Sequence, residues 1–106
     1  MRNAIVSATL LLFPMASTAD AGDHVVVQKD KAFSPVQLTI KSGDTITFKN
    51  DDPVNHNVFS ETKGLEFSLK SQKPGESDTV TLNGVGTVEV RCAFHPAMKL
   101  VVTVEK

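Results

Sequence analysis

The chain has 106 residues, enough for one domain with a single hydrophobic core. Hydrophobic residues make up 41% and charged residues 22%, which is the composition of a globular protein rather than a disordered one. The formal net charge of -1 and the lack of a Lys/Arg cluster interleaved with aromatic residues exclude a broad basic surface, so we expect no nucleic-acid partner.

The first 21 residues differ in composition from the rest. Arg2 supplies one positive charge, an apolar run extends from Ala4 to Met15, and small residues follow it. This order predicts a secretory signal peptide over residues 1–21, cleaved after Ala19 or after Ala21, and therefore export to the periplasm. The run is shorter than the roughly 20 apolar residues of a membrane span. A hydrophobic strand or helix belonging to the fold is the alternative.

The domain that would remain, residues 22–106, contains one cysteine, Cys92. It therefore has no intramolecular disulfide, although an exported protein meets an oxidising compartment. Domains of this size usually need a disulfide or a metal ion for stability, and we expect a metal here.

Short segments rich in Val, Ile, Thr and Phe follow one another downstream, separated by clusters of Gly, Pro, Asp, Asn and Ser. Apolar residues alternate within several of them, so that Ile46 and Phe48 share one face of their segment, as do Leu100, Val102 and Val104. The pattern predicts an all-β domain, a two-sheet β-sandwich or a closed barrel. The eight predicted strands are His24–Gln28, Val36–Ile40, Asp44–Lys49, Asn57–Ser60, Glu66–Leu69, Asp78–Leu82, Thr87–Cys92 and Lys99–Val104.

The densest group of reactive side chains lies between the last two predicted strands. Cys92, His95 and Met98 occur at every third position, and Cys92 and Met98 are the only Cys and the only Met after residue 21. A loop held between two strands can turn all three side chains toward one point. His56, at the start of a predicted strand, can supply a second imidazole. Two His, one Cys and a weak axial Met are the ligands of a mononuclear copper electron-transfer site.

Each of these residues also has an ordinary interpretation, because a single Cys or Met is often core and a single His is often on the surface. A zinc site is disfavoured, since a thioether is a poor zinc ligand. A nucleophilic Cys92–His95 pair would leave Met98 and His56 unexplained. Four protein ligands leave no open position on a metal, so we expect no enzymatic activity. His24 has no comparable neighbours in sequence and is interpreted as a surface residue, with a second metal site as the alternative.

The sequence resembles the cupredoxins, the small blue-copper proteins, and most closely their amicyanin and plastocyanin-like group. The resemblance covers the chain after the signal peptide. Its motifs are Ser42-Gly43-Asp44, Asn50-Asp51, His56-Asn57-Val58, and Cys92-x-x-His95-x-x-Met98 before a last strand. The two-residue gap between His95 and Met98, and Pro96 after His95, are similar to amicyanin.

The resemblance implies a Greek-key β-sandwich with three strong equatorial copper ligands, His56, Cys92 and His95, and a long axial one, Met98. It also implies that Asn50 ties the loop of the first ligand to the Cys loop. Where the family usually has Thr or Ser after the Cys, this chain has Ala93. Phe94 and Arg91 are further departures that leave the ligand set intact.

We therefore expect a monomeric electron carrier that cycles one copper ion between Cu(I) and Cu(II). Redox partner proteins would dock transiently on an apolar rim around His95, formed by Pro96, Ala97, Pro53 and Pro74. The alternative function is copper binding and delivery in copper homeostasis, which would use the same ligands. The chain lacks the Met-rich or His-rich tracts that copper buffers often carry. A metal-free sandwich for adhesion or assembly is a third interpretation.

Overall fold

A computed structural model describes residues 22–106, so the predicted signal peptide lies outside the described residues. The described residues contain no helix with the length and apolar character needed to cross a membrane. Within them the chain forms nine strands: β1 (Asp23–Lys29), β2 (Ala32–Ser34), β3 (Gln37–Lys41), β4 (Thr45–Asn50), β5 (Val58–Ser60), β6 (Phe67–Ser68), β7 (Ser77–Thr81), β8 (Gly86–Cys92) and β9 (Lys99–Glu105).

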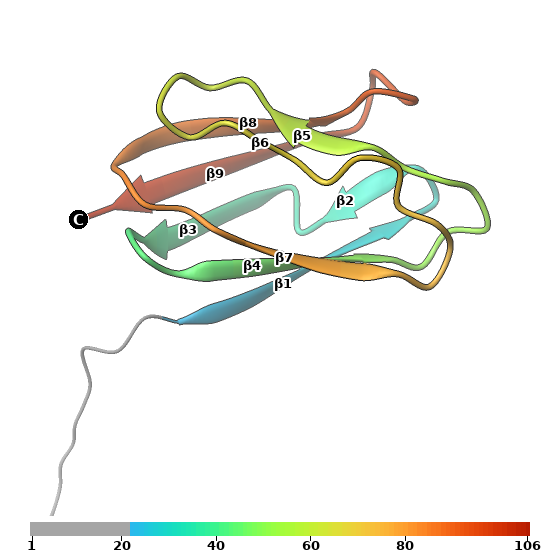
Figure 1. The fold of residues 1–106 in the computed structure, drawn as a ribbon, viewed down its shortest axis with the longest axis horizontal. Coiled ribbons are helices and arrows are strands. Elements are labelled where there is room, and N and C mark those ends of the chain that lie inside the picture. The colour runs from blue at the N-terminus through green and yellow to red at the C-terminus, as the bar shows by residue number, and fades with distance from the viewer. Residues whose placement is uncertain (1–21) are drawn as a thin grey trace, which may run out of the picture.

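The strands form two sheets that face each other (Figure 1). One sheet has the order β2-β1-β4-β7 and the other has the order β3-β9-β8-β5-β6. The β1–β4 and β3–β9 pairs are parallel and the remaining pairs are antiparallel. The predicted all-β sandwich is therefore confirmed, and each predicted strand has its counterpart within a few residues.

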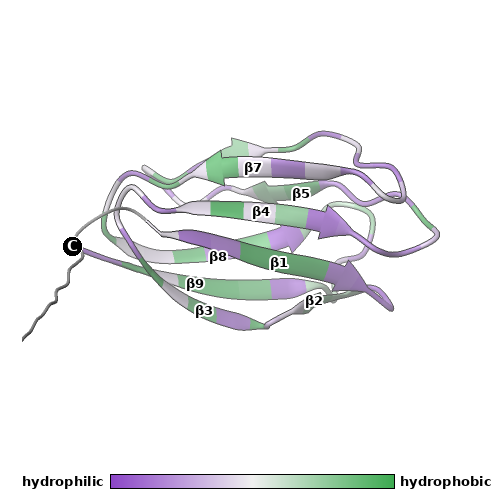
Figure 2. Ribbon diagram, turned by 90° about the horizontal axis from the view of Figure 1, so that it is seen from below, coloured by the Kyte–Doolittle hydropathy of each residue, from purple (hydrophilic) through white to green (hydrophobic). Residues whose placement is uncertain are grey.

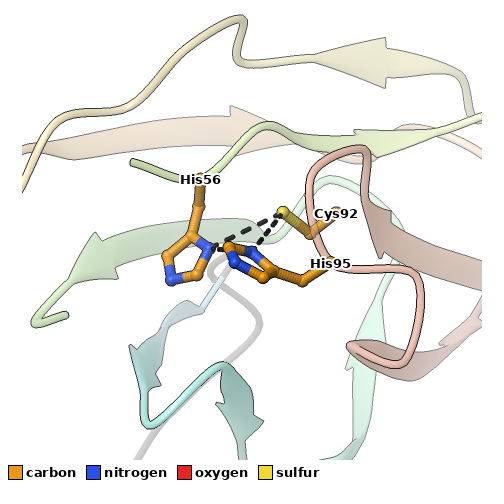
Figure 3. A group of neighbouring side chains, drawn as sticks. All are labelled: His56, Cys92 and His95. Carbon is orange, nitrogen blue, oxygen red and sulfur yellow. Dashed lines mark hydrogen bonds between the residues drawn. The ribbon is translucent and has the colours of Figure 1, made fainter. Parts of the chain in front are cut away.

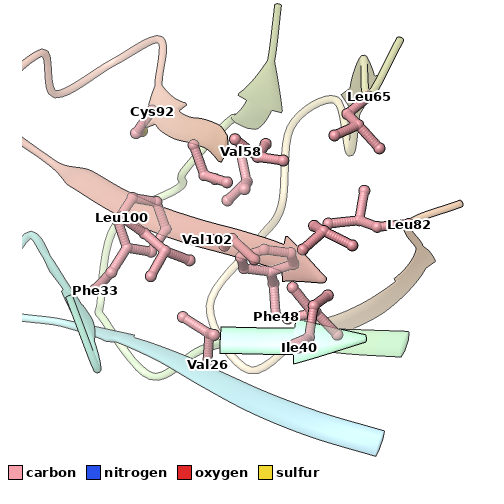
Figure 4. Packing of buried hydrophobic residues seen from close by; sticks show 14 of the residues in the cluster. Val26, Phe33, Ile40, Phe48, Val58, Leu65, Leu82, Cys92, Leu100 and Val102 are labelled. Atoms are coloured by element: carbon pink, nitrogen blue, oxygen red, sulfur yellow. The ribbon is translucent and has the colours of Figure 1, made fainter. Parts of the chain in front are cut away.

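The core lies between the two sheets and follows the predicted alternation. Ile46 and Phe48 of β4 are fully buried, and apolar residues alternate with polar ones along this strand (Figure 2). Phe48 packs against Phe33, with ring centroids 6.3 Å apart (Figure 4). It also packs against Phe67, with ring centroids 5.8 Å apart. From the opposite sheet, β9 contributes three buried side chains to the same cluster, Leu100, Val102 and Val104.

Strand β2 is absent from the sequence prediction. It pairs with β1 through a two-residue turn, Asp30-Lys31, in which both residues have positive φ, 54° and 55°. Hairpin turns of this kind favour Asn-Gly or Asp-Gly, so a lysine at the second position gives no turn signal. The turn is instead held from outside, because the backbone N–H groups of Asp30 and Lys31 donate to the carboxylate of Asp52 at 2.6 and 2.9 Å.

A second buried carboxylate, Asp44, joins the starts of β1 and β4. It accepts hydrogen bonds from the backbone N–H groups of Lys41 and Gly22, at 2.9 and 2.7 Å, and from Nε2 of His24 at 2.9 Å. These hydrogen bonds lower the pKa of Asp44 from 3.8 to about 2, and the bond from Lys41 has the largest effect. The carboxylate is therefore ionised under all physiological conditions.

We predict that Asp44→Asn destabilises the protein in a pH-dependent way. The folded-state pKa lies below the unfolded value, so the native state binds fewer protons; the contribution of Asp44 is complete above about pH 4 and disappears as the pH falls toward about 2. Denaturant unfolding from pH 7 to pH 2 measures the free energy of unfolding of the unchanged protein and of the variant. The gap between the two values should close in this window. The control is Glu61→Gln, at an exposed carboxylate, and an equally large gap for this control would contradict the prediction.

Candidate metal centre

The predicted metal ligands lie at the end of the sandwich opposite the C-terminus, where the β4–β5 and β8–β9 connections meet (Figure 1). His56 precedes β5 and is fixed by a bridge to Gln72, in which each backbone N–H donates to the other residue's carbonyl, at 3.0 and 2.7 Å. Cys92 is the last residue of β8, and His95 lies in the loop that leads to β9. Paired backbone on both sides therefore limits the movement of these side chains.

Two successive turns shape the loop, and each turn joins residues that lie three positions apart. The N–H of His95 donates to the carbonyl of Cys92 at 3.3 Å, and the N–H of Met98 donates to the carbonyl of His95 at 2.9 Å. Arg91 closes the loop from outside, since its Nη2 donates to the carbonyl of Pro96 at 3.2 Å. Met98 itself is buried, with 1% of its surface exposed, directly before β9.

The structure brings His56, Cys92 and His95 together, with one ligand atom from each within 4.8 Å of the others (Figure 3). The Sγ atom of Cys92 lies 3.6 Å from Nδ1 of His56 and 3.7 Å from Nδ1 of His95. The two Nδ1 atoms are 3.2 Å apart. His56 and Cys92 are buried, whereas His95 is partly exposed, so the group reaches the surface only through the His95 ring.

The carboxylate of Asp52 sets the orientation of His56. The Nε2 atom of His56 lies 2.7 Å from Oδ2 of Asp52, and both side chains are buried. Burial raises the pKa of Asp52, but the hydrogen bonds from His56 and from the backbone of Lys31 and Asp30 outweigh it, so the pKa is lower than usual. An ionised carboxylate accepts only, which places the proton of the ring on Nε2 and leaves a free lone pair on Nδ1 directed at Cys92 and His95.

The backbone of Asn57 joins the two ligand-bearing segments. Its N–H donates to Sγ of Cys92 at 3.4 Å, and its carbonyl accepts the N–H of Ala93 at 3.0 Å. A hydrogen bond to the sulfur disperses negative charge on a thiolate, and such bonds influence the redox potential of copper-thiolate sites.

The predicted role of Asn50 is wrong. Its side-chain Nδ2 donates to the carbonyls of Val54 and Gln72, at 2.9 and 3.0 Å, and its Oδ1 accepts the N–H of Asp52 at 2.9 Å. These bonds use both N–H groups of the amide, and within residues 22–106 none of them reaches the loop from Cys92 to Met98. The amide of Asn50 instead holds the His56 loop to the Gln72 segment.

Gln72 was not among the predicted site residues, yet it is fully buried behind His56. Its Nε2 donates to the carbonyl of Phe48 at 2.8 Å and to Asp78 at 3.0 Å, and its Oε1 accepts from Gln28 at 2.6 Å. A glutamine in a predicted loop carries no such signal in the sequence. Its side chain anchors the bridge to His56 in the four-stranded sheet.

The donor atoms fit copper. Two imidazole nitrogens and one cysteine sulfur face a common point, a set of soft and intermediate ligands that suits copper and is unsuited to Mg²⁺ or Ca²⁺, which take oxygen ligands. The free lone pair on Nδ1 of His56 is the form that a metal requires.

A family model described as a Cupredoxin-like domain matches residues 3–104. The chain is a cupredoxin. This cupredoxin is 34% identical over 96 residues to amicyanin from Paracoccus denitrificans, with 88% of this chain and 72% of that protein covered. It is 41% identical over 78 residues to a chloroplastic plastocyanin from rice, Oryza sativa subsp. indica, with 65% of this chain covered; the match spans about half of that protein, 51%. A solved structure of an amicyanin variant in its reduced Cu(I) form has a TM-score of 0.72 at 28% identity, with 83% of this chain and 86% of that chain covered.

We predict that Asp52→Ala weakens both the fold and metal binding. The substitution leaves the N–H groups of Asp30 and Lys31 and the Nε2 of His56 without their partner. His56 is buried, and an unpaired buried donor costs about 1–3 kcal/mol. A histidine ligand without its outer hydrogen bond usually loses 10–100-fold in metal affinity, and we expect a loss on the order of tenfold or more. Denaturant unfolding and chelator competition for copper would measure the two effects. Asp51→Ala, which removes an exposed neighbouring carboxylate, is the control, and equal losses in both variants would contradict the role of Asp52.

Proposed function

We propose that this cupredoxin is a periplasmic electron carrier that holds one copper ion through His56, Cys92, His95 and Met98. The observation that carries the proposal is the approach of three ligand atoms to within 4.8 Å from two separate parts of the sandwich, the residue before β5 and the end of β8 with the loop after it. The similarity to amicyanin and plastocyanin supports the same function.

Bound copper supplies a one-electron couple between Cu(I) and Cu(II). The protein's part is to keep the ligands in one place in both oxidation states. His56 is held by its bridge to Gln72 and by Asp52, and Cys92 is held by β8 and by the N–H of Asn57. Because backbone pairing and buried hydrogen bonds fix these side chains, little rearrangement should accompany electron transfer.

Met98 is the proposed axial ligand. Its place at the end of the second turn, its burial and the soft character of its sulfur support this role. A thioether bound weakly on the axis is the arrangement that tunes the potential of blue-copper sites.

The partly exposed ring of His95 is the proposed path for the electron. The four residues of the predicted docking rim, Pro96, Ala97, Pro53 and Pro74, are exposed, which supports this role. Two apolar side chains next to them in sequence are also exposed, Phe94 at 51% and Val54 at 36%. An apolar rim with few charges suits brief contact with partner proteins, since transient electron-transfer interfaces are small.

The proposed periplasmic location rests on the composition of residues 1–21, which have the order of a signal peptide. The single buried Cys92 is consistent with this location, because a free thiol in an oxidising compartment is protected by burial and by a bound metal.

We predict that one equivalent of Cu(II) added to the purified protein produces an intense thiolate-to-copper absorption band. The band should bleach with a reductant and return with an oxidant, with no loss of copper. Cys92→Ser should abolish the band, because a hydroxyl cannot replace the thiolate. Absence of the band would refute the ligand set, and release of copper on reduction would favour copper delivery over electron transfer.

We also predict that Ala97→Asp slows electron exchange on the order of tenfold and leaves the absorption band unchanged, because it buries a charge at each docking event. Line broadening of NMR signals in mixtures of the reduced and oxidised forms would measure the exchange between two copies of the protein. Val85→Asp, in the exposed β7–β8 turn at the other end of the sandwich, is the control. A changed band with normal exchange would refute the assignment of the docking rim.

A further inference from the structure

A second group of potential metal ligands lies at the start of β1, at the end of the sandwich opposite His56 (Figure 1). The backbone nitrogen of Gly22 is 2.7 Å from Oδ1 of Asp44, and Nε2 of His24 is 2.9 Å from Oδ2 of the same carboxylate. The His24 ring also lies against Gly22, since a Cβ atom at position 22 would be 3.4 Å from Nε2. Two nitrogens and a carboxylate therefore converge on one place.

The nature of the first nitrogen depends on where the signal peptide is removed. Cleavage after Ala21 hydrolyses the Ala21–Gly22 peptide bond. The hydroxyl of the water goes to the carbonyl carbon of Ala21, which becomes a carboxylate, and the hydrogen goes to the nitrogen of Gly22, which becomes an α-amine. The amide nitrogen beside Asp44 then becomes a primary amine, which carries a lone pair for a metal once its proton is lost. The Nε2 of His24, which donates to Asp44 in the described structure, binds a metal when the ring proton moves to Nδ1. Cleavage after Ala19 leaves it an amide and places the new amine two residues away.

We propose that cleavage after Ala21 creates a second copper site, specific for Cu(II), that is formed by the α-amine of Gly22, the Nε2 of His24 and the carboxylate of Asp44. Nitrogen and oxygen donors suit the tetragonal Cu(II) ion, which also binds such sites more tightly than other divalent ions of the first transition row. The group contains no sulfur ligand, so its preference for Cu(II) contrasts with the redox-active set around Cys92. The inference does not depend on the proposed electron transfer.

The position of Asp44 makes this group more than a chance surface cluster. The carboxylate is 4% exposed, so the fold holds it in place more firmly than a surface carboxylate. The backbone N–H of Lys41 fixes its Oδ2 at 2.9 Å. The three donors line a surface hollow of about 290 Å³, which leaves room for water as a further ligand; its charged neighbours, Lys41 and Glu105, offset each other.

The first experiment is the intact mass of the full-length chain after export in a bacterium. A chain that begins at Gly22 is expected, and a chain that begins at Asp20 would overturn the inference. The exported protein is then titrated with Cu(II) alone, by calorimetry and by electron paramagnetic resonance. Two equivalents should bind, the first with the thiolate band and the second without it. The second should show the wider hyperfine splitting of nitrogen- and oxygen-bound Cu(II) and should be lost on reduction.

Three variants test the ligands. A protein that begins at Ala21 moves the amine by one residue, about 3.3 Å along an extended chain, and should lose the second equivalent. His24→Gln and Asp44→Asn should lose it too, and all three should keep the thiolate band. Retention of the second equivalent in any of them would overturn the proposed ligand set. Loss of the thiolate band with the second equivalent intact would instead refute the proposed function and leave this inference standing.

Discussion

The candidate metal centre depends on the hydrogen bonds of one buried carboxylate, that of Asp52. It accepts from two backbone N–H groups of the β1–β2 turn and from the ring of His56, so one buried charge fixes a strained hairpin and a ligand together. A buried carboxylate is costly unless its lone pairs are satisfied, and here three donors satisfy them. The direction of the His56 lone pair is therefore a property of the folded four-stranded sheet rather than of a single rotamer.

Around this carboxylate, hydrogen bonds of amide side chains hold the segments together, whereas apolar packing does so elsewhere in the sandwich. Asn50 and Gln72 are fully buried and each makes three hydrogen bonds through its side chain, which connect the end of β4, the His56 loop and the segment before β7. Such bonds are directional, and a shift of any one segment would break several of them. The proposed metal ligands lie at the boundary between this polar network and the apolar core that contains Cys92 and Met98.

The sequence was sufficient for the sandwich and for the loop that carries Cys92, His95 and Met98, because both follow from local patterns. The approach of His56 to Cys92, 36 residues away, follows instead from the pairing of β5 with β8. Alternation in β4 and β9 determines which side chains enter the core. Cys92, His95 and Met98 are joined by two turns within the same loop. It was insufficient where a distant partner decides. Strand β2 depends on Asp52 holding a turn without glycine, and one bond of Asn50 depends on the backbone carbonyl of Gln72, 22 residues away. Neither partner is visible from the composition of its own segment.

The joint between the two ligand loops consists of main-chain groups on the Asn57 side, an N–H on the Cys92 sulfur and a carbonyl on the N–H of Ala93. Any residue other than proline presents the same N–H and carbonyl at position 57. The electronic environment of the sulfur is consequently insulated from side-chain variation at this joint. Exposed side chains of the loop can therefore change without disturbing the backbone contact beneath them. Ala93 is an example, since its N–H donates to the carbonyl of Asn57 although its side chain has no hydroxyl.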